Sequence, residues 1–134
     1  MENSRIRIGG SLQKINKRKI GADKEAFVCE WLERHGYKVL ERNFRCRSGE
    51  IDIVARESGY LVFIEVKYRS RDTNGLPQEA VDARKQRVNS RVALYYLYRF
   101  GYGESTPVRF DVVALFGEKD FSVTLYQNAF EFCG

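Results

Sequence analysis

Residues 49–69 read GEIDIVARESGYLVFIEVKYR, a pattern that predicts a β-hairpin. Residues 50–56 suit a strand in which Glu50, Asp52 and Val54 share one face, and the apolar run from 61 to 66 is typical of a central strand. Ser58-Gly59 is a two-residue turn of the kind that joins antiparallel strands, or residues 57–60 together form a four-residue loop. Both loops give the same pairing of the two strands, whereas a three-residue loop would shift it.

This pairing brings charged side chains together on one face of the hairpin. Asp52 lies opposite Glu65 and Glu50 lies opposite Lys67, with Cβ atoms about 5 Å apart across the strands. Like charges placed opposite each other destabilise a sheet, so two carboxylates among apolar neighbours indicate a bound cation. Mg²⁺ and Mn²⁺ accept oxygen ligands, commonly one or two carboxylates together with phosphate oxygens. We therefore expect Asp52 and Glu65 to bind Mg²⁺ or Mn²⁺, and Lys67 to hold the attacking water or offset phosphate charge.

A third acid, Glu25, lies on the first predicted helix, within about one turn of the apolar stripe at residues 28–32, so it points inward or towards the sheet edge. The alternative is a glutamate that the helix dipole favours at a helix start. Each of the other residues also has a structural alternative: Asp52 as an edge-strand charge, and Glu65 with Lys67 as a solvent-facing pair. The hairpin that gathers them favours a catalytic site.

The rest of the chain predicts one α/β sheet domain in two or three layers, over residues 20–134. Residues 1–19 are basic with little apolar periodicity, so we expect a mobile N-terminal arm. The expected elements are a helix over 22–35, strands over 37–45, 50–56 and 61–66, a helix from Pro77 to 99, and strands over 108–116 and 121–126.

Composition limits the classes of function. The 134 residues suit one domain, and 23 Lys and Arg against 18 Asp and Glu give a net charge of +5, which favours polyanionic partners, although a solvated basic face has the same composition. The single histidine, His35, excludes zinc sites with two or more His ligands. Three cysteines without a CxxC pair fit the reducing cytoplasm. Neither an export signal nor a run of about twenty apolar residues is present, so we expect a cytoplasmic protein outside the membrane.

Basic residues near the acids are candidates for contacts with nucleic acid. Two groups lie in different parts of the chain, one at the ends of the predicted strands and one along the second helix. The first group is Arg45, Arg47, Ser48 and Arg69, and the second is Arg84, Lys85 and Arg87. We expect Arg45 and Arg47 to contribute more, because a flexible loop there could close over a phosphate. The alternative for the second group is a solvated helix face.

The same hairpin motif resembles the YraN family of small bacterial proteins. The likeness extends over roughly residues 20 to 130 and includes Gly36-Tyr37, Arg109-Phe110-Asp111 and Asn128-Ala129-Phe130, with further matches at Pro77-Gln78-Glu79 and Lys85-Gln86-Arg87. The family is regarded as restriction-endonuclease-like, of the PD-(D/E)XK type, and is similar in layout to archaeal Holliday-junction resolvases.

The resemblance implies a mixed β-sheet flanked by helices, with Glu25 as the helix acid, Asp52 and Glu65 as metal ligands, and Lys67 as the motif lysine. Lys24-Glu25 stands where the family usually has Gly-Glu, so the lysine changes the packing or adds a phosphate contact.

Three functions follow as hypotheses. The preferred one is a metal-dependent endonuclease that hydrolyses DNA, with branched DNA among its candidate substrates and a homodimer as a candidate assembly. The second is a non-catalytic nucleic-acid-binding protein on the same fold. The third is a structural adaptor that uses the long helix or the C-terminal tail for protein contacts. Metal binding at Asp52 and Glu65 separates the adaptor from the others, and cleavage separates the first from the second.

Overall fold

The computed structural model describes residues 7–8, 12–13, 24–69, 81–116 and 121–133. Within these residues, two helices and seven strands form an α/β fold consistent with a restriction-endonuclease-like domain. The helices are α2 (Lys24–Arg34) and α3 (Ala83–Arg99). The strands are β1 (Arg7–Ile8), β2 (Leu12–Gln13), β3 (Lys38–Cys46), β4 (Gly49–Glu57), β5 (Tyr60–Arg69), β6 (Val108–Phe116) and β7 (Phe121–Phe130).

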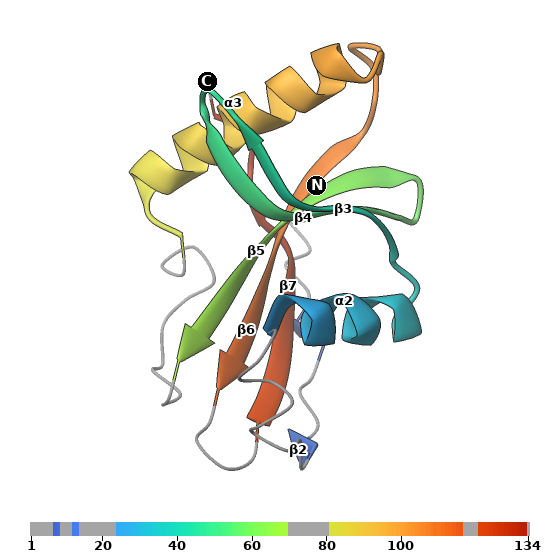
Figure 1. Ribbon diagram of the computed structural model, residues 1–134, viewed down its shortest axis with the longest axis vertical. Coiled ribbons are helices and arrows are strands. Elements are labelled where there is room, and N and C mark those ends of the chain that lie inside the picture. Colours follow the sequence, from blue (N-terminus) through green and yellow to red (C-terminus); the bar gives the residue numbers. More distant parts are fainter. Residues whose placement is uncertain (1–6, 9–11, 14–23, 70–80, 117–120, 134) are drawn as a thin grey trace.

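The strands form one mixed sheet in the order β1-β7-β6-β5-β4-β3, and β2 also pairs with β7. β5 runs parallel to β6 and antiparallel to β4, which confirms its predicted central place. The two helices cover opposite faces (Figure 1) because side chains alternate along β5: Val62 and Ile64 pack with the α2 layer, and Leu61 and Phe63 pack with the α3 layer. The domain therefore has three layers.

Helix boundaries follow local capping signals. Gly36 and Gly101, with φ of 91° and 74°, follow α2 and α3 and end them in the left-handed conformation that glycine adopts freely. α3 begins later than the predicted Pro77, which lies outside the described residues. The Asp82 side chain accepts a hydrogen bond from the Lys85 N–H at 2.8 Å and caps the helix at its observed start.

The hairpin of β4 and β5 has the predicted register. Ser58 and Gly59 both have positive φ, 51° and 83°, as a tight two-residue turn requires. The ladder runs from Glu57 opposite Tyr60 to Ile53 opposite Ile64. Asp52 is therefore the first residue of β4 beyond the paired ladder, and it lies next to Glu65 in the neighbouring strand.

β4 changes direction at Asp52. Ile51 and Ile53 are two residues apart, yet Ile53 packs in the α2 layer and Ile51 in the α3 layer. The end of the β3–β4 hairpin accordingly curves over α3 (Figure 1). A Cβ atom added to Gly49 would lie 2.5 Å from Val88 Cγ1, so the hairpin tip lies directly against the helix. The bend sets Asp52 where the two strands separate.

The predicted N-terminal arm contains two short strands in its described part, β1 and β2, both antiparallel to β7. The sequence predicted no strand there, because two-residue strands carry no measurable alternation. The other residues of the arm, and with them the predicted mobility, lie outside the described part of the chain.

Candidate acidic site

The Asp52 carboxylate accepts a hydrogen bond from a backbone N–H of β5 that lies beyond the end of the β4–β5 ladder. The Val66 N–H donates to Asp52 Oδ2 at 2.8 Å. Burial raises the pKa of Asp52 most, this hydrogen bond lowers it, and the charges of Glu65 and Glu25 raise it further, to about 6. The positive charge of Lys85 lowers the pKa of Asp52. The carboxylate is thus held in a place that disfavours its charged form.

Glu65 is the most buried of the site acids, with its side chain 8% exposed. Two ammonium groups approach the same oxygen: Lys67 Nζ lies 3.9 Å and Lys85 Nζ lies 3.8 Å from Glu65 Oε2. Lys67 does not meet Glu50 as the extended register predicted. The ladder ends at Ile53, and Glu50 instead accepts a hydrogen bond from Arg45 Nε at 2.6 Å.

Glu25 lies in the first turn of α2, and its charge acts on Asp52. The start of α2 therefore lies close enough to Asp52 for the charge of Glu25 to act on it. Beside it, Lys24 Nζ lies 3.7 Å from the centre of the Tyr68 ring. The lysine that replaces the usual glycine thus packs on the strand that carries Glu65 and Lys67.

The donor atoms of this site suit a hard divalent cation. Asp52 and Glu65 supply carboxylate oxygens, and Mg²⁺ commonly binds through one or two protein carboxylates while keeping several waters. Among the described residues, no group of three or more His, Cys, Asp or Glu side chains lies close enough to hold a metal ion. The residues present therefore fit a two-carboxylate site completed by water and phosphate, and they do not form an all-protein cage.

The raised pKa of Asp52 gives a prediction for stability against pH. A folded-state pKa above the ordinary 3.8 means that the folded protein binds this proton more tightly, so ionisation of Asp52 costs stability as the pH rises from about 4 to about 6. The rise to about 6 corresponds to at most about 3 kcal/mol, and solvent access reduces this. Asp52→Asn keeps an acceptor for Val66, and we expect it to raise the free energy of unfolding at pH 7.5 by about 1 to 2 kcal/mol.

Urea unfolding of the metal-free proteins at pH 7.5 and pH 4 measures this difference. The gain should be much smaller at pH 4, close to the unfolded-state pKa of 3.8, because the folded protein still carries a protonated Asp52 there and little of the proton-linked stability has been lost. Glu50→Gln is the matched control, since Glu50 lies on the same strand but pairs with exposed Arg45. A gain that is equal at both pH values would contradict the assigned cause.

The hairpin tip differs from the flexible loop that the sequence predicted. Arg47 and Ser48 form a two-residue turn between β3 and β4, and the tip is fixed against α3 through Gly49. Arg45 lies in β3 and pairs with Glu50. All three candidate contacts are exposed, but no mobile loop joins them to the acids. The expectation that Arg45 and Arg47 contribute most to phosphate binding thereby loses its basis.

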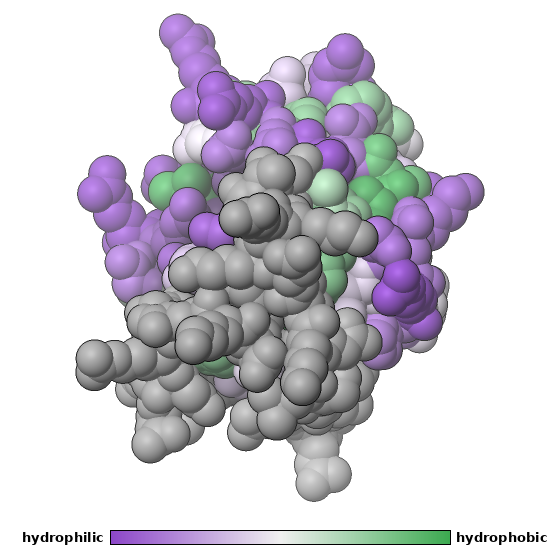
Figure 2. All heavy atoms as spheres, turned by 60° about the horizontal axis from the view of Figure 1, so that its bottom comes forward, coloured by the Kyte–Doolittle hydropathy of each residue, from purple (hydrophilic) through white to green (hydrophobic). Residues whose placement is uncertain are grey.

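The second basic group lies on the same helix as a site residue. Arg84 and Arg87 are exposed on α3, while Lys85, between them, points to Glu65. The structure thus brings Lys85 into the acidic site instead of leaving it with the exposed arginines. Arg69 is the last residue of β5, and its side chain lies outside the described part. On the face of the molecule shown in Figure 2, the described surface that remains visible is largely hydrophilic, with smaller hydrophobic areas.

A buried polar cluster on the α2 face was not predicted. Asp111 is fully buried and accepts hydrogen bonds from the Tyr37 hydroxyl at 2.7 Å, from Arg109 at 2.8 and 2.9 Å, and from the Asn128 N–H at 2.9 Å. Burial and the nearby Asp111 raise the pKa of Tyr37, which keeps its proton on the hydroxyl. Because both Asp111 oxygens already accept hydrogen bonds from protein donors, we assign the cluster a role in stabilising the fold and not in binding a ligand.

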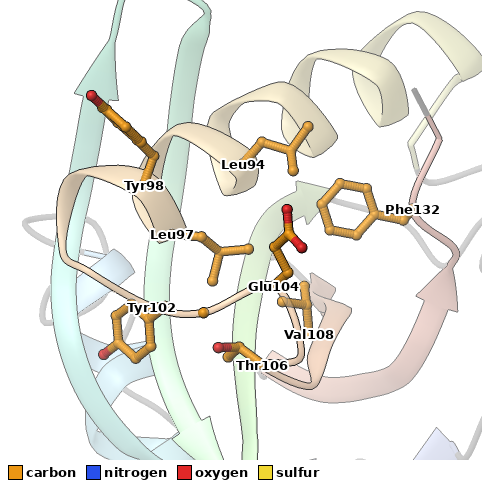
Figure 3. Close-up of a pocket in the computed structure, with 9 residues that line it drawn as sticks. Leu94, Leu97, Tyr98, Tyr102, Glu104, Thr106, Val108 and Phe132 are labelled. Carbon is orange, nitrogen blue, oxygen red and sulfur yellow. The ribbon is translucent and has the colours of Figure 1, made fainter.

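A separate apolar pocket of about 470 Å³ lies between the C-terminal half of α3, the loop after it and Phe132. Leu94, Leu97 and Val108 surround it (Figure 3), and Glu104 is the one charged residue of its nine-residue lining. Such a lining offers no pair of oxygen ligands. A metal ion is therefore expected at Asp52 and Glu65, beside the opposite end of α3, and not in this pocket.

Comparison with known proteins identifies relatives over most of the chain. The chain is 49% identical over 120 residues to a UPF0102 protein of Lachnoclostridium phytofermentans, which covers 90% of this chain and 99% of that protein. It is 43% identical over 118 residues to a UPF0102 protein of Geobacter metallireducens, covering 87% and 96%. No helix in the described residues is long and apolar enough to cross a membrane. The model of the "Uncharacterised protein family UPF0102" matches residues 24–115, and the chain belongs to this family, as the YraN-like motif predicted.

Proposed function

We propose that this protein is a divalent-metal-dependent endonuclease that hydrolyses phosphodiester bonds in DNA. One observation carries the proposal: Asp52 and Glu65 meet where two strands separate, with lysines from two different elements beside them. Burial and neighbouring acids raise the pKa of Asp52 to about 6. A group kept in an environment that opposes its charge is a candidate functional group, because a purely structural position would favour a neutral residue.

In the proposed mechanism, each residue of the site has a separate role. Asp52 and Glu65 would hold Mg²⁺ or Mn²⁺, and Glu25, whose charge acts on Asp52, would act from further away by orienting a ligand water. When bound, the cation supplies positive charge to a phosphate oxygen and lowers the pKa of water. Lys67 is positioned to orient the attacking water or to offset charge that grows on the phosphate. The Val66 N–H fixes the Asp52 carboxylate, so one ligand is oriented before the cation arrives.

We favour DNA as the substrate. Branched DNA is included among the candidate substrates because the YraN-like motif resembles the layout of archaeal Holliday-junction resolvases. Arg84 and Arg87 are exposed on α3 before and after Lys85 in the sequence, so they can hold the phosphate backbone beside the acidic site. Cutting both strands of a duplex requires either two events or two copies of the chain, and a homodimer remains part of the proposal.

The test is purified full-length protein with Mg²⁺ or Mn²⁺ against single-stranded, duplex, flap and four-way DNA, with duplex RNA as the comparison. We expect nicking or cutting that stops when EDTA removes the cation. Cleavage that continues in EDTA, or a folded protein that binds no Mn²⁺, would exclude the metal-dependent mechanism.

The second candidate is a non-catalytic nucleic-acid-binding protein. It is favoured by the two ammonium groups beside Glu65, which neutralise the carboxylate without a metal ion. Such a protein shifts DNA in a gel and never cuts it, so the same substrate panel separates the two functions.

Both candidates predict a steep dependence of DNA binding on salt. The contacts are Arg and Lys to phosphates, so affinity should fall linearly in log–log form as salt rises. Replacing Arg84 and Arg87 together by Gln should reduce the slope by about two, since each phosphate contact adds about one. Arg45→Gln should have a smaller effect because Glu50 already pairs with Arg45. Fluorescence anisotropy of a labelled duplex across salt concentrations measures this, and an unchanged slope in the double variant would move the DNA surface away from α3.

A further inference from the structure

The Lys85 ammonium lies beside the same Glu65 carboxylate that would bind a metal ion, so the two cations would compete for it. Its Nζ lies 3.8 Å from Glu65 Oε2, and its side chain is 42% exposed. This distance exceeds the roughly 2.7 to 2.9 Å of a charge-assisted hydrogen bond, so the ammonium is near the carboxylate without being fixed to it. The lysine backbone, in contrast, is fixed, because its N–H donates to the Asp82 cap. Only the long side chain needs to move for Lys85 to leave Glu65.

The two lysines of the site differ in where they can go. Lys67 is two residues from Glu65 on the same strand face, so it stays in the site. Lys85 comes from the first turn of α3, between exposed Arg84 and Arg87. A rotation about its own side-chain bonds therefore carries the Lys85 ammonium from the acids towards the solvent side of the helix start. That is the side where a DNA phosphate would lie in the proposed function.

Electrostatics links this movement to metal binding. A divalent cation held by Glu65 and an ammonium about 4 Å from the same oxygen repel each other strongly in a partly buried site. In the protein alone, a displaced ammonium gains only water as its partner. With DNA bound, it gains a phosphate, and the cation and the DNA then each favour the binding of the other.

We infer that Lys85 is a resident counter-cation of the acidic site, which leaves Glu65 when a divalent cation binds and is then held by a phosphate of the DNA. The inference rests on the proposed function and adds a regulation to it: metal affinity is low in the free protein and rises when nucleic acid is bound. The site thereby stays weakly loaded until its substrate arrives.

The opposite role makes the opposite prediction. A lysine that merely positions Glu65 as a ligand would be needed for metal binding, and its loss would weaken the affinity for Mn²⁺. A displaced counter-cation opposes metal binding, so its loss strengthens that affinity. The sign of the change in Mn²⁺ affinity therefore decides between the two roles without any measurement of cleavage.

The experiment is calorimetric titration of Mn²⁺ into the full-length protein at constant ionic strength. We expect Lys85→Gln to bind Mn²⁺ about tenfold more tightly than the wild type when no DNA is present. Lys85→Arg, which keeps the charge, and Arg84→Gln, which removes a neighbouring exposed charge, should both bind like the wild type. Circular dichroism confirms that each variant is folded.

A second titration adds a short phosphorothioate DNA duplex, which keeps the backbone charge and resists cleavage. The wild type should then bind Mn²⁺ about tenfold more tightly than without the duplex, and Lys85→Gln should lose this gain. If the wild type binds Mn²⁺ and Lys85→Gln binds it equally or more weakly, or keeps the full gain with DNA, the role of Lys85 is wrong and the proposed function stands. If neither folded protein binds Mn²⁺, the proposed function fails and this inference with it.

Discussion

Asp52→Ala and Glu65→Ala are each expected to lower metal-dependent DNA cleavage by at least about a thousandfold, with DNA binding largely kept. Each change removes one of the two carboxylates that the site offers to a cation, and the described residues supply no third acid, His or Cys close enough to replace it. DNA binding should persist because its contacts come from exposed arginines. Cleavage rates, Mn²⁺ calorimetry and gel shifts on the same preparations measure the three properties separately.

Two further variants sharpen this test. Lys67→Ala should still bind Mn²⁺ and should cleave poorly, because it loses only water orientation and charge stabilisation. Glu50→Ala is the matched control, an acid two residues from Asp52 whose recorded partner is Arg45, and it should cleave like the wild type. If Asp52→Ala binds Mn²⁺ as the wild type does and still cuts DNA, the acidic site is structural and the assignment is wrong.

The parts of the fold that local chemistry determines were predictable from the sequence. The pairing of β4 with β5 follows from the alternation of side chains and from Ser58-Gly59, since a two-residue turn with two positive φ angles allows one register. The end of α3 at Arg99 and the bounds of β6 follow from glycines and apolar runs in the same way. In each case the deciding residues are neighbours in the chain.

The details of the site depend on contacts between distant segments, and the sequence did not reveal them. The bend of β4 at Asp52 arises because Gly49 lies against Val88 of α3, and no local signal marks that contact. Lys85 reaches Glu65 because the Asp82 cap sets where α3 begins, whereas the pattern pointed to Pro77. One residue of difference along a helix turns a side chain by about 100°, so helix register decides which residue enters a site.

One residue in the sequence did indicate the buried cluster around Asp111. An aspartate between Phe110 and Val112, in a strand that is otherwise apolar apart from Arg109, indicates a buried charge that needs partners. The partners could not be named from the sequence, because Tyr37 and Asn128 are far along the chain. They meet where the register of β6 and β7 shifts between Phe110 and Val112, and the shift turns the Asn128 N–H towards the Asp111 carboxylate.

Asp111→Ala is expected to lower the free energy of unfolding by about 3 to 5 kcal/mol, the usual cost of removing one member of a buried charge pair. The change removes the carboxylate that accepts from Arg109, from the Tyr37 hydroxyl and from the Asn128 N–H. Arg109 keeps its ion pair with Glu57 at 2.8 Å. The substitution also removes a side chain that links β6 to β7 at the shift in their register. Urea unfolding followed by circular dichroism gives the change, and the melting temperature should fall by roughly 10 °C or more.

Tyr37→Phe is the graded comparison for this prediction. It keeps the ring in the core and removes one donor to Asp111, together with the acceptor of Gln127 and Arg109. A loss of about 1 to 3 kcal/mol is expected, less than for Asp111→Ala, because the carboxylate keeps Arg109 and Asn128 as donors. Asp111 faces the α2 layer and Glu65 the α3 layer, so the folded fraction of both variants should bind Mn²⁺ with wild-type affinity. Loss of Mn²⁺ binding in folded Tyr37→Phe would instead make this cluster part of the acidic site, since a purely stabilising role predicts that stability and metal affinity change independently.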